Sequence, residues 1–235
     1  MINLIKEIEP NLNPSKISCD YELAAVNAFK GGFPNAHILG CFFHLTRNLR
    51  KHLGELHLMG RYNNDANFAI EARMITSLAF VPIDDLDTAI DELANVLPLE
   101  LQPILQWFED AYVGRPNRRG NGRRPAIFPP EVWSVYDRVL NDVDRTNNHA
   151  EAAHRRLCTE LSMTHPTIWK FIDVLKTIQS GRDVYLEQLI AGREPPPKKR
   201  KYVEADRRIK SMVENYNRNI IDFLRGISHN YKMNA

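Results

Sequence analysis

The sequence predicts an α/β fold that is predominantly helical, with one short pair of parallel strands near its start. Two apolar segments, residues 16–20 and 36–41, are expected to form buried strands, and an alanine-rich helical segment, residues 22–30, lies between them. A strand, a helix and a second strand within about 25 residues make a βαβ crossover, which joins parallel strands. Almost everything after Phe42 shows apolar residues at helical spacing.

The composition is that of an ordinary globular protein. The chain has 235 residues, of which 43% are hydrophobic and 26% charged, so it can bury a full core. No apolar run reaches the roughly 18 residues of a membrane-spanning helix, and acids interrupt the start before a signal peptide could form. The three cysteines, Cys19, Cys41 and Cys158, are too few for a secreted disulfide framework. We therefore expect a protein of a reducing compartment with no membrane partner.

Helical spacing predicts the remaining elements in order. A short helix precedes the first strand and ends before Pro14, whose ring cannot continue it. Asp84 and Asp85 lie in the first turn of a later helix, where the helix dipole favours acids, and Pro166 suits the first turn of a long one. The predicted helices cover residues 2–8, 43–58, 67–80, 83–96, 99–112, 130–140, 148–161, 166–189 and, as one amphipathic helix, 204–231.

The net charge is only +2, but one segment, residues 115–125, holds several arginines and no acid. Glycine and proline punctuate this segment, which predicts a flexible loop. The planar guanidinium group binds phosphate oxygens with two hydrogen bonds, so contact with DNA is one interpretation, and a solvated loop without a partner is the other. The candidate DNA-contact residues are Arg115, Arg118, Arg119, Arg123 and Arg124.

A second basic segment follows three prolines at residues 195–197. The consecutive cations Lys198, Lys199, Arg200 and Lys201 are expected on an extended backbone, because prolines disfavour a helix. An extended basic run of this kind is what nuclear import receptors bind, and it resembles the short viral type of localisation signal. The sequence thus predicts a nuclear protein, with a plain charged linker as the alternative.

Two acids stand out by their position. Asp20 ends the first predicted strand, where α/β sheets present ligands and catalytic groups. Glu151 lies in the first turn of a helix that Asn147 or Asn148 can cap, and His154 follows one turn later on the same face. Two carboxylates from distant segments are typical of two-metal phosphoryl transfer, for which Mg²⁺ is the usual ion. The alternative is that both acids are surface charges or helix caps.

Cys41 and His44 form a C-x-x-H pair at the end of the second strand. Both residue types bind zinc, but a structural zinc site needs four ligands. Cys19 and His37 lie nearby in the sequence, yet no second paired motif exists. We therefore expect no zinc, and interpret the pair as a buried cysteine and a hydrogen-bonded histidine.

Several of these motifs together resemble the Mutator-like element (MULE) transposase domain. The similarity extends over about residues 1–190 and lies in the order and spacing of short motifs rather than in any one of them. These motifs are Ser18-Cys19-Asp20-Tyr21-Glu22, Phe33-Pro34, Gly40-Cys41-Phe42-Phe43-His44, Leu78-Ala79-Phe80-Val81-Pro82, Phe108-Glu109, Tyr112-Val113-Gly114, Trp133-Ser134-Val135-Tyr136, Arg145-Thr146-Asn147-Asn148, Glu151, His154, and His165-Pro166 with Trp169.

The resemblance implies an RNase H-like fold with a large helical insertion, here about residues 45–145. It also implies an Asp-Asp-Glu triad that uses Mg²⁺ or Mn²⁺ to cleave DNA and transfer strands. By motif, Asp20 matches the second aspartate and Glu151 the glutamate, while Cys41 and His44 match the family's C-x-x-H.

The family's first aspartate has no counterpart, because it lies on a strand upstream of a three-stranded meander. Glu7 and Glu9 fall on the opening helix and cannot replace it. We therefore expect a partial RNase H-like domain over residues 1–190, truncated or domesticated and inactive alone. Residues 191–235 would form a basic linker and a C-terminal helix.

Two other interpretations remain open. The chain could be a nuclear interaction module with a vestigial acidic site, or a fragment of a longer product whose preceding part supplies the first aspartate. The expected partners are DNA and an import receptor. Self-association is also expected, because a lone strand pair exposes an unpaired edge.

Overall fold

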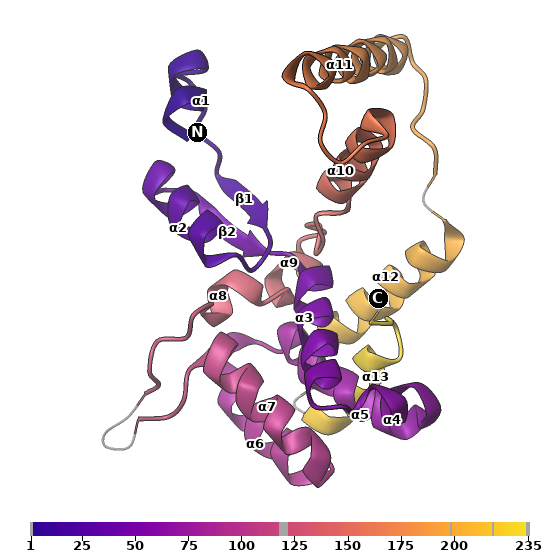
Figure 1. Cartoon of the computed structure of the whole chain (residues 1–235). Coiled ribbons are helices and arrows are strands. Elements are labelled where there is room, and N and C mark those ends of the chain that lie inside the picture. Colours follow the sequence, from indigo (N-terminus) through magenta and orange to yellow (C-terminus); the bar gives the residue numbers. More distant parts are fainter. Residues whose placement is uncertain (1, 118–121, 198, 218, 234–235) are drawn as a thin grey trace. The chain divides into compact units, whose positions relative to one another are not determined.

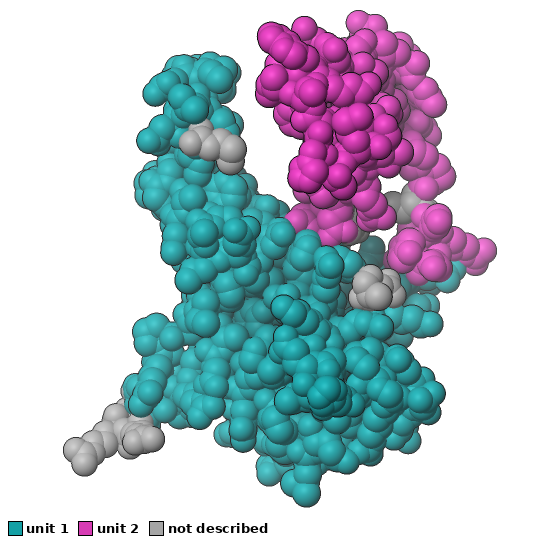
Figure 2. Space-filling view, in the orientation of Figure 1, with its two compact units in different colours: residues 1–146, 204–235 teal, residues 147–203 magenta. Residues whose placement is uncertain are grey.

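The computed structural model describes residues 2–117, 122–197, 199–217 and 219–233 (Figure 1). The chain forms two compact units (Figure 2). Unit 1 comprises residues 1–146 and 204–235, and unit 2 comprises residues 147–203. Each unit is described by itself below.

Unit 1 begins with the predicted βαβ crossover. Helix α1 (Ile2–Ile8) precedes strand β1 (Lys16–Cys19), and helix α2 (Leu23–Gly32) joins it to strand β2 (His37–Gly40). The strands pair in parallel, with Lys16 opposite His37 and Cys19 opposite Gly40. The α/β, predominantly helical class is thus confirmed, and each strand is slightly shorter than predicted.

The helices that follow are shorter than the periodicity predicts, because the chain turns within the predicted segments. His57, with φ of 59°, takes a left-handed conformation between α3 and α4, where one helix was expected. At Ser134 the backbone becomes extended, and the amide of Val135 donates to the carbonyl of Ala79 at 2.8 Å. The helices are α3 (Phe42–Glu55), α4 (Met59–Asn64), α5 (Ala66–Ser77), α6 (Leu86–Val96), α7 (Gln102–Phe108), α8 (Pro130–Trp133) and α9 (Tyr136–Leu140).

Short 3-10 and π turns link these helices, at Leu78–Phe80, Ile83–Asp85, Leu99–Leu101 and Glu109–Val113. The core of unit 1 forms around α3, whose Leu45, Leu49 and Leu53 are fully buried at four-residue spacing. Burying each leucine contributes about 1.5–3 kcal/mol, so this stripe is a main contribution of α3 to the core.

The C-terminal segment forms two helices, so the prediction of one helix over residues 204–231 was wrong. Helix α12 (Arg200–Glu214) ends before an asparagine-rich turn, and α13 (Ile220–Ser228) follows it. Helix α13 packs against α5 and buries the apolar side chains of Ile220, Phe223, Leu224 and Ile227. The last helix is therefore part of the main core, and the compact units do not divide near residue 190.

Unit 2 is a helical hairpin of α10 (Asn148–Leu161) and α11 (Ile168–Ile190) (Figure 1). Helix α10 has the predicted bounds. Helix α11 begins after Pro166, because the Thr167 hydroxyl accepts a hydrogen bond from the amide of Lys170 and so caps it. No helix within the described ranges is long and apolar enough to cross a membrane.

Candidate functional site

The carboxyl edge of the strand pair gathers three predicted site residues. Asp20 follows β1 and Cys41 follows β2, and the amide of Cys41 donates to the carbonyl of Cys19 at 3.0 Å. A carboxylate oxygen of Asp20 lies 3.9 Å from Nε2 of His44. The Asp20 side chain is 57% exposed and that of His44 is 16% exposed. The edge therefore presents a solvent-accessible carboxylate beside a partly buried imidazole.

The cysteines at this edge, Cys19 and Cys41, are both buried, which confirms the interpretation of Cys41 as a buried residue. Burial raises the pKa of the Cys19 thiol, and the charge of Asp20 raises it further. Cys41 occupies the N-cap position of α3, so His44 lies in the first turn of that helix. The C-x-x-H spacing thus places its histidine beside Asp20.

Arg138 stabilises the carboxyl edge of the strand pair through hydrogen bonds to backbone carbonyls, and the sequence analysis did not single it out. Its buried guanidinium donates from Nη1 to the carbonyl of Gly40 at 2.7 Å and from Nη2 to that of Asp144 at 2.8 Å. Burial lowers the pKa of Arg138, because its charged form loses solvation. Only its apolar neighbours in α9 could have signalled that this arginine faces inward.

Tyr21 fills the space beside Gly40. Its ring packs edge-on against the rings of Tyr112 and Phe128, with centroid distances of 5.3 and 5.2 Å. Burial raises the pKa of Tyr21 well above its ordinary value, so its hydroxyl stays protonated. The residues that flank Asp20 are therefore rigidly packed, while Asp20 itself is open to solvent.

The helical segment after β2 returns to the same edge. The amide of Phe42 donates to the carbonyl of Arg145 at 2.8 Å. The Arg145 guanidinium lies 5.6 Å from the centre of the Phe80 ring and pairs with Asp206 of α12. Residue 145 is thus held at the end of β2, a few positions before the helix that carries Glu151.

Unit 2 holds the second predicted carboxylate. Asn147 occupies the N-cap position of α10 as predicted, but its side chain makes no capping hydrogen bond. Its carbonyl accepts instead from the amides of Ala150 and Glu151, at 2.9 and 3.2 Å. Glu151 lies in the first turn as predicted, 22% exposed, with an oxygen 3.5 Å from Nη2 of Arg155.

Two neighbours of Glu151 were also predicted to matter. The side chain of Asn148 lies outside what the structure describes. His154 lies one turn beyond Glu151, and its Nε2 is 3.6 Å from Sγ of Cys158. Asp20 belongs to unit 1 and Glu151 to unit 2, so the expected proximity of the two carboxylates stays a prediction.

The arginine-rich loop has an ordered base. Pro116 and Arg123 form an antiparallel bridge, and the amide of Arg124 donates to the carbonyl of Arg115 at 2.9 Å. Arg115 pairs with Asp110 through both carboxylate oxygens, one of them at 2.6 Å. The pKa of Arg115 is raised by this hydrogen bond, which stabilises the charged form.

Arg123 makes still more hydrogen bonds within the fold, and its role as a DNA contact stays a prediction. It donates to Asp87 at 2.6 Å, to Glu109 at 3.0 Å and to the carbonyl of Gly114 at 2.7 Å. Burial lowers the pKa of Arg123, but its hydrogen bonds to Glu109 and Asp87 outweigh that effect. Arg123 therefore anchors the base of the loop to the helices beside it.

The other three arginines of the loop differ from these two. Arg118 and Arg119 lie outside the described residues. Arg124 is exposed, and its side chain has no partner within the described ranges. Of the candidate DNA contacts that the structure describes, Arg124 alone keeps an uncompensated charge.

The basic run after the prolines is partly helical. Lys198 lies outside the described residues, and Lys199 directly precedes α12. Arg200 and Lys201 fall in the first turn of α12, so the expected extended backbone is wrong from Arg200 onward. The amide of Tyr202 donates to the carbonyl of Lys199 at 2.9 Å, which begins the helix after the last proline.

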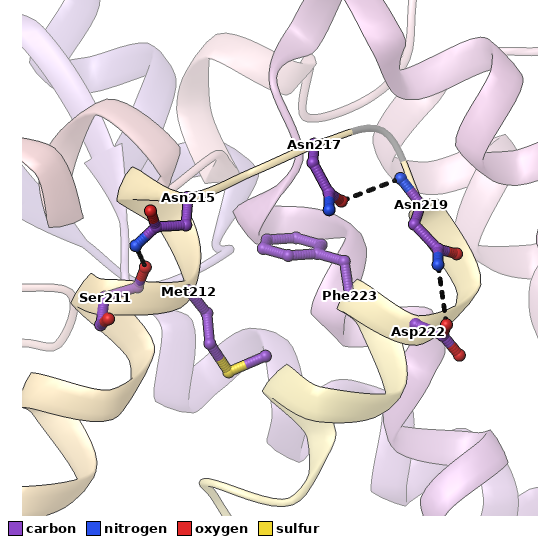
Figure 3. A pocket seen from close by; sticks show the side chains of 7 residues that line it. All are labelled: Ser211, Met212, Asn215, Asn217, Asn219, Asp222 and Phe223. Atoms are coloured by element: carbon purple, nitrogen blue, oxygen red, sulfur yellow. Dashed lines mark hydrogen bonds between the residues drawn. The ribbon is translucent and has the colours of Figure 1, made fainter.

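A pocket lies where α12 meets α13 (Figure 3). Its polar groups bond to one another: the Asn215 amide donates to the carbonyl of Ser211 at 2.7 Å, and that of Asn219 to Asp222 at 2.8 Å. These groups hydrogen-bond within the turn, so few of their polar atoms are left to bind a ligand. Among the described residues, no group of three or more His, Cys, Asp and Glu side chains could hold a metal ion.

Comparison of the chain with models of protein families, with curated proteins and with solved structures gives no match.

Proposed function

We propose that the protein derives from a DDE transposase of the Mutator-like type and acts on DNA in the nucleus. On this proposal Asp20 and Glu151 are two carboxylates of an incomplete metal site. Neither β1 nor β2 carries a further acid that could match the family's first aspartate. The protein is then expected to bind DNA and to bind Mg²⁺ or Mn²⁺ weakly, without cleaving or joining DNA ends by itself.

The observation that carries this proposal is the hydrogen bond between the Phe42 amide and the Arg145 carbonyl. The family resemblance implies a helical insertion between the strand before the C-x-x-H motif and the helix that bears the glutamate. A segment that leaves the end of β2 and returns to it supports that topology, because both ends of the insertion then lie at the edge with Asp20.

Chain connectivity gives further support. Six peptide units lead from Arg145 to Glu151, so at about 3.3–3.6 Å per residue Glu151 lies within about 20 Å of Arg145. The first turn of α10 shortens this reach further. The length of the intervening chain is thus compatible with a metal site that includes Glu151.

The residues fit a metal only in part. Asp20 offers an exposed carboxylate, which is the ligand type that Mg²⁺ prefers, and Mg²⁺ keeps several waters when protein ligands are few. No three-ligand group exists among the described side chains. The fit is thus that of a weak site, and the proposal includes no catalytic step at the metal.

The first experiment measures Mn²⁺ binding to the full chain by electron paramagnetic resonance. Asp20→Asn and Glu151→Gln should each weaken binding by about tenfold or more, since loss of a ligand costs at least as much as loss of a supporting partner. Asp91→Asn removes an exposed carboxylate of α6 and should change nothing. Equal affinity in all four proteins would overturn the metal site.

The second experiment measures duplex binding across a salt series and end cleavage with Mn²⁺. Binding that weakens with salt, without cleavage, is the expected result. Metal-dependent cleavage that Asp20→Asn abolishes would show that the site is complete. Failure to bind DNA at low salt would favour the alternative of a nuclear interaction module.

A further inference from the structure

Unit 2 has a core that is small for a separately packed body. Among the described residues of this unit, Leu161, Val174 and Ile178 alone form its buried core, with Leu157 and Phe171 partly buried around them. A core of this size supplies little of the free energy that a stable hairpin needs. A further apolar contact is therefore expected on this unit.

Helix α11 carries a second stripe, apolar except at its centre, beside the residues Phe171, Val174 and Ile178 that form the hairpin core. Its positions alternate at spacings of four and three residues, which is the a and d pattern of a coiled-coil seam. Ile168 is 62% exposed, Leu175 42% and Leu186 56%, and the flanking Trp169 and Ile190 are 75% and 78% exposed. The stripe consists of Ile168, Ile172, Leu175, Gln179, Arg182, Leu186 and Leu189.

We propose that a second copy of this chain covers the stripe, with the two α11 helices antiparallel about a two-fold axis. In this register Ile172 meets the partner's Leu189, and Leu175 meets the partner's Leu186. Gln179 meets the partner's Arg182 in the central layers. All apolar residues of the two outer layers then face apolar residues, and the polar layer lies on the axis.

Charge complementarity selects the antiparallel pairing. The e positions beside the seam place Lys176 against the partner's Asp183, twice in the dimer. They also place Trp169 against the partner's Ile190. A parallel pair would instead bring Arg182 against the partner's Arg182 within the seam, and like charges at such a distance repel.

The expected dimer is weak. Helix α11 has 23 residues and is thus about 35 Å long, so a single pair of such helices forms an interface at the small end of specific complexes. This inference is independent of the metal site and of DNA binding, because it concerns α11 alone.

Sedimentation of the full chain over a wide concentration range tests the dimer. The wild type should dimerise as concentration rises, and Leu175→Glu or Leu186→Glu should weaken the dimer at least about tenfold, because a charge would enter the seam. Leu99→Glu, at a position of unit 1 that is 86% exposed, is the matched control and should not change it. A monomer at every concentration, or Leu175→Glu with wild-type affinity, would overturn the proposal.

Charge exchange tests the register. Lys176→Glu and Asp183→Lys should each weaken the dimer a few-fold, and the double variant should recover it, because the two charges then swap places across the axis. A double variant weaker than both single variants would refute the pairing.

A spin label tests the direction. Cys158 is the exposed cysteine, whereas Cys19 and Cys41 are buried, so Lys170→Cys in a Cys158→Ser background gives one reactive site. Antiparallel helices place the two labels about 30 Å apart along the axis. Parallel helices would place the two labels at the same level, so a distance without this axial separation would overturn the proposed arrangement.

Discussion

The backbone amide of Phe42 donates a hydrogen bond to the carbonyl of Arg145 at 2.8 Å, and so joins the two ends of the helical segment. Arg138 adds a second connection through the carbonyl of Gly40 at 2.7 Å. The entropy of closing so long a segment grows only slowly with its length, so a few such bonds and the helical core suffice. The edge that presents Asp20 is thus assembled from residues far apart in the sequence.

Gly40 is expected to tolerate no side chain. A Cβ at this position would lie 2.5 Å from the hydroxyl of Tyr21, whose ring is confined by Tyr112 and Phe128. Gly40→Ala should therefore lower the free energy of unfolding by about 1–3 kcal/mol, measured by urea denaturation. In the matched control, Gly60→Ala, no atom lies within 4 Å of the new carbon, and the helix should gain about 0.5–1 kcal/mol. A destabilised Gly60→Ala or an unchanged Gly40→Ala would contradict this account.

Arg138 is expected to be essential to the stability of unit 1. Arg138→Ala removes hydrogen bonds to the carbonyls of Gly40 and Asp144 and leaves both without that donor. The loss should be about 3 kcal/mol, because each bond from a charged group contributes about 1.5–3 kcal/mol. Lys51→Ala deletes an exposed cation paired with Glu55 and should cost less than about 0.5 kcal/mol. Similar losses in the free energy of unfolding for the two variants would show that the buried hydrogen bonds of Arg138 stabilise the protein no more than an exposed ion pair does.

The strand pair and α10 could be predicted because their signals are local. Alternating polar and apolar residues, a crossover of the right length and a helix start near Asn147 all lie within short windows. His44 lies near Asp20 because both follow paired strands, a proximity that the sequence analysis did not predict.

What could not be predicted depends on contacts between distant segments. The burial of α13 follows from its fit against α5, which no short window contains. Arg138 carries a charge that is usually exposed, and its partner Gly40 is 98 positions away. Arg123 is paired with two acids, Asp87 and Glu109, which likewise come from other helical segments. Net charge in a segment is therefore a poor guide to free charge in the fold.

Tyr231 is expected to make stability depend on alkaline pH. Its buried hydroxyl donates to the carbonyl of Arg73 at 2.7 Å and contacts the hydroxyls of Thr76 and Ser77. Burial raises its pKa to about 12, although the hydrogen bonds to Ser77 and Thr76 lower it. The unfolded chain loses this proton near pH 10, so stability should be complete below pH 10 and fall as pH rises through 12.

The complete loss of stability that the ionisation of Tyr231 causes at alkaline pH corresponds to about 3 kcal/mol. Tyr231→Phe removes the titrating group, so urea denaturation should show a smaller loss of stability between pH 9 and 12 than in the wild type. At pH 8 the same variant should be less stable by about 1 kcal/mol, because the carbonyl of Arg73 loses one of its donors while the hydroxyls of Thr76 and Ser77 still donate to it. An identical alkaline profile for both proteins would mean that other groups cause the decline.

Nuclear import is expected to depend on the basic run although α12 begins within it. Lys199→Ala with Arg200→Ala should shift a reporter fusion, too large to diffuse through nuclear pores, into the cytoplasm. The reason is that both cations are exposed and belong to the basic run that begins at Lys198, directly after the prolines. Arg155→Ala with Arg156→Ala removes two exposed cations of α10 and should leave the fusion nuclear. Unchanged nuclear accumulation in the first double variant would identify the run as an ordinary linker.

Neighbouring arginines of the loop are expected to have opposite effects on DNA binding and on stability. Arg124→Ala should weaken duplex binding and reduce the salt slope by about 0.9 for each phosphate that the arginine neutralises, with stability unchanged, because its side chain is exposed. Arg123→Ala should mainly lower the free energy of unfolding, by about 1–3 kcal/mol, because Asp87, Glu109 and the carbonyl of Gly114 lose their donor. Fluorescence anisotropy across salt and urea denaturation measure the two effects. If Arg124→Ala leaves the slope at its wild-type value while Arg123→Ala lowers it in a protein of normal stability, the assignment of the two arginines is reversed.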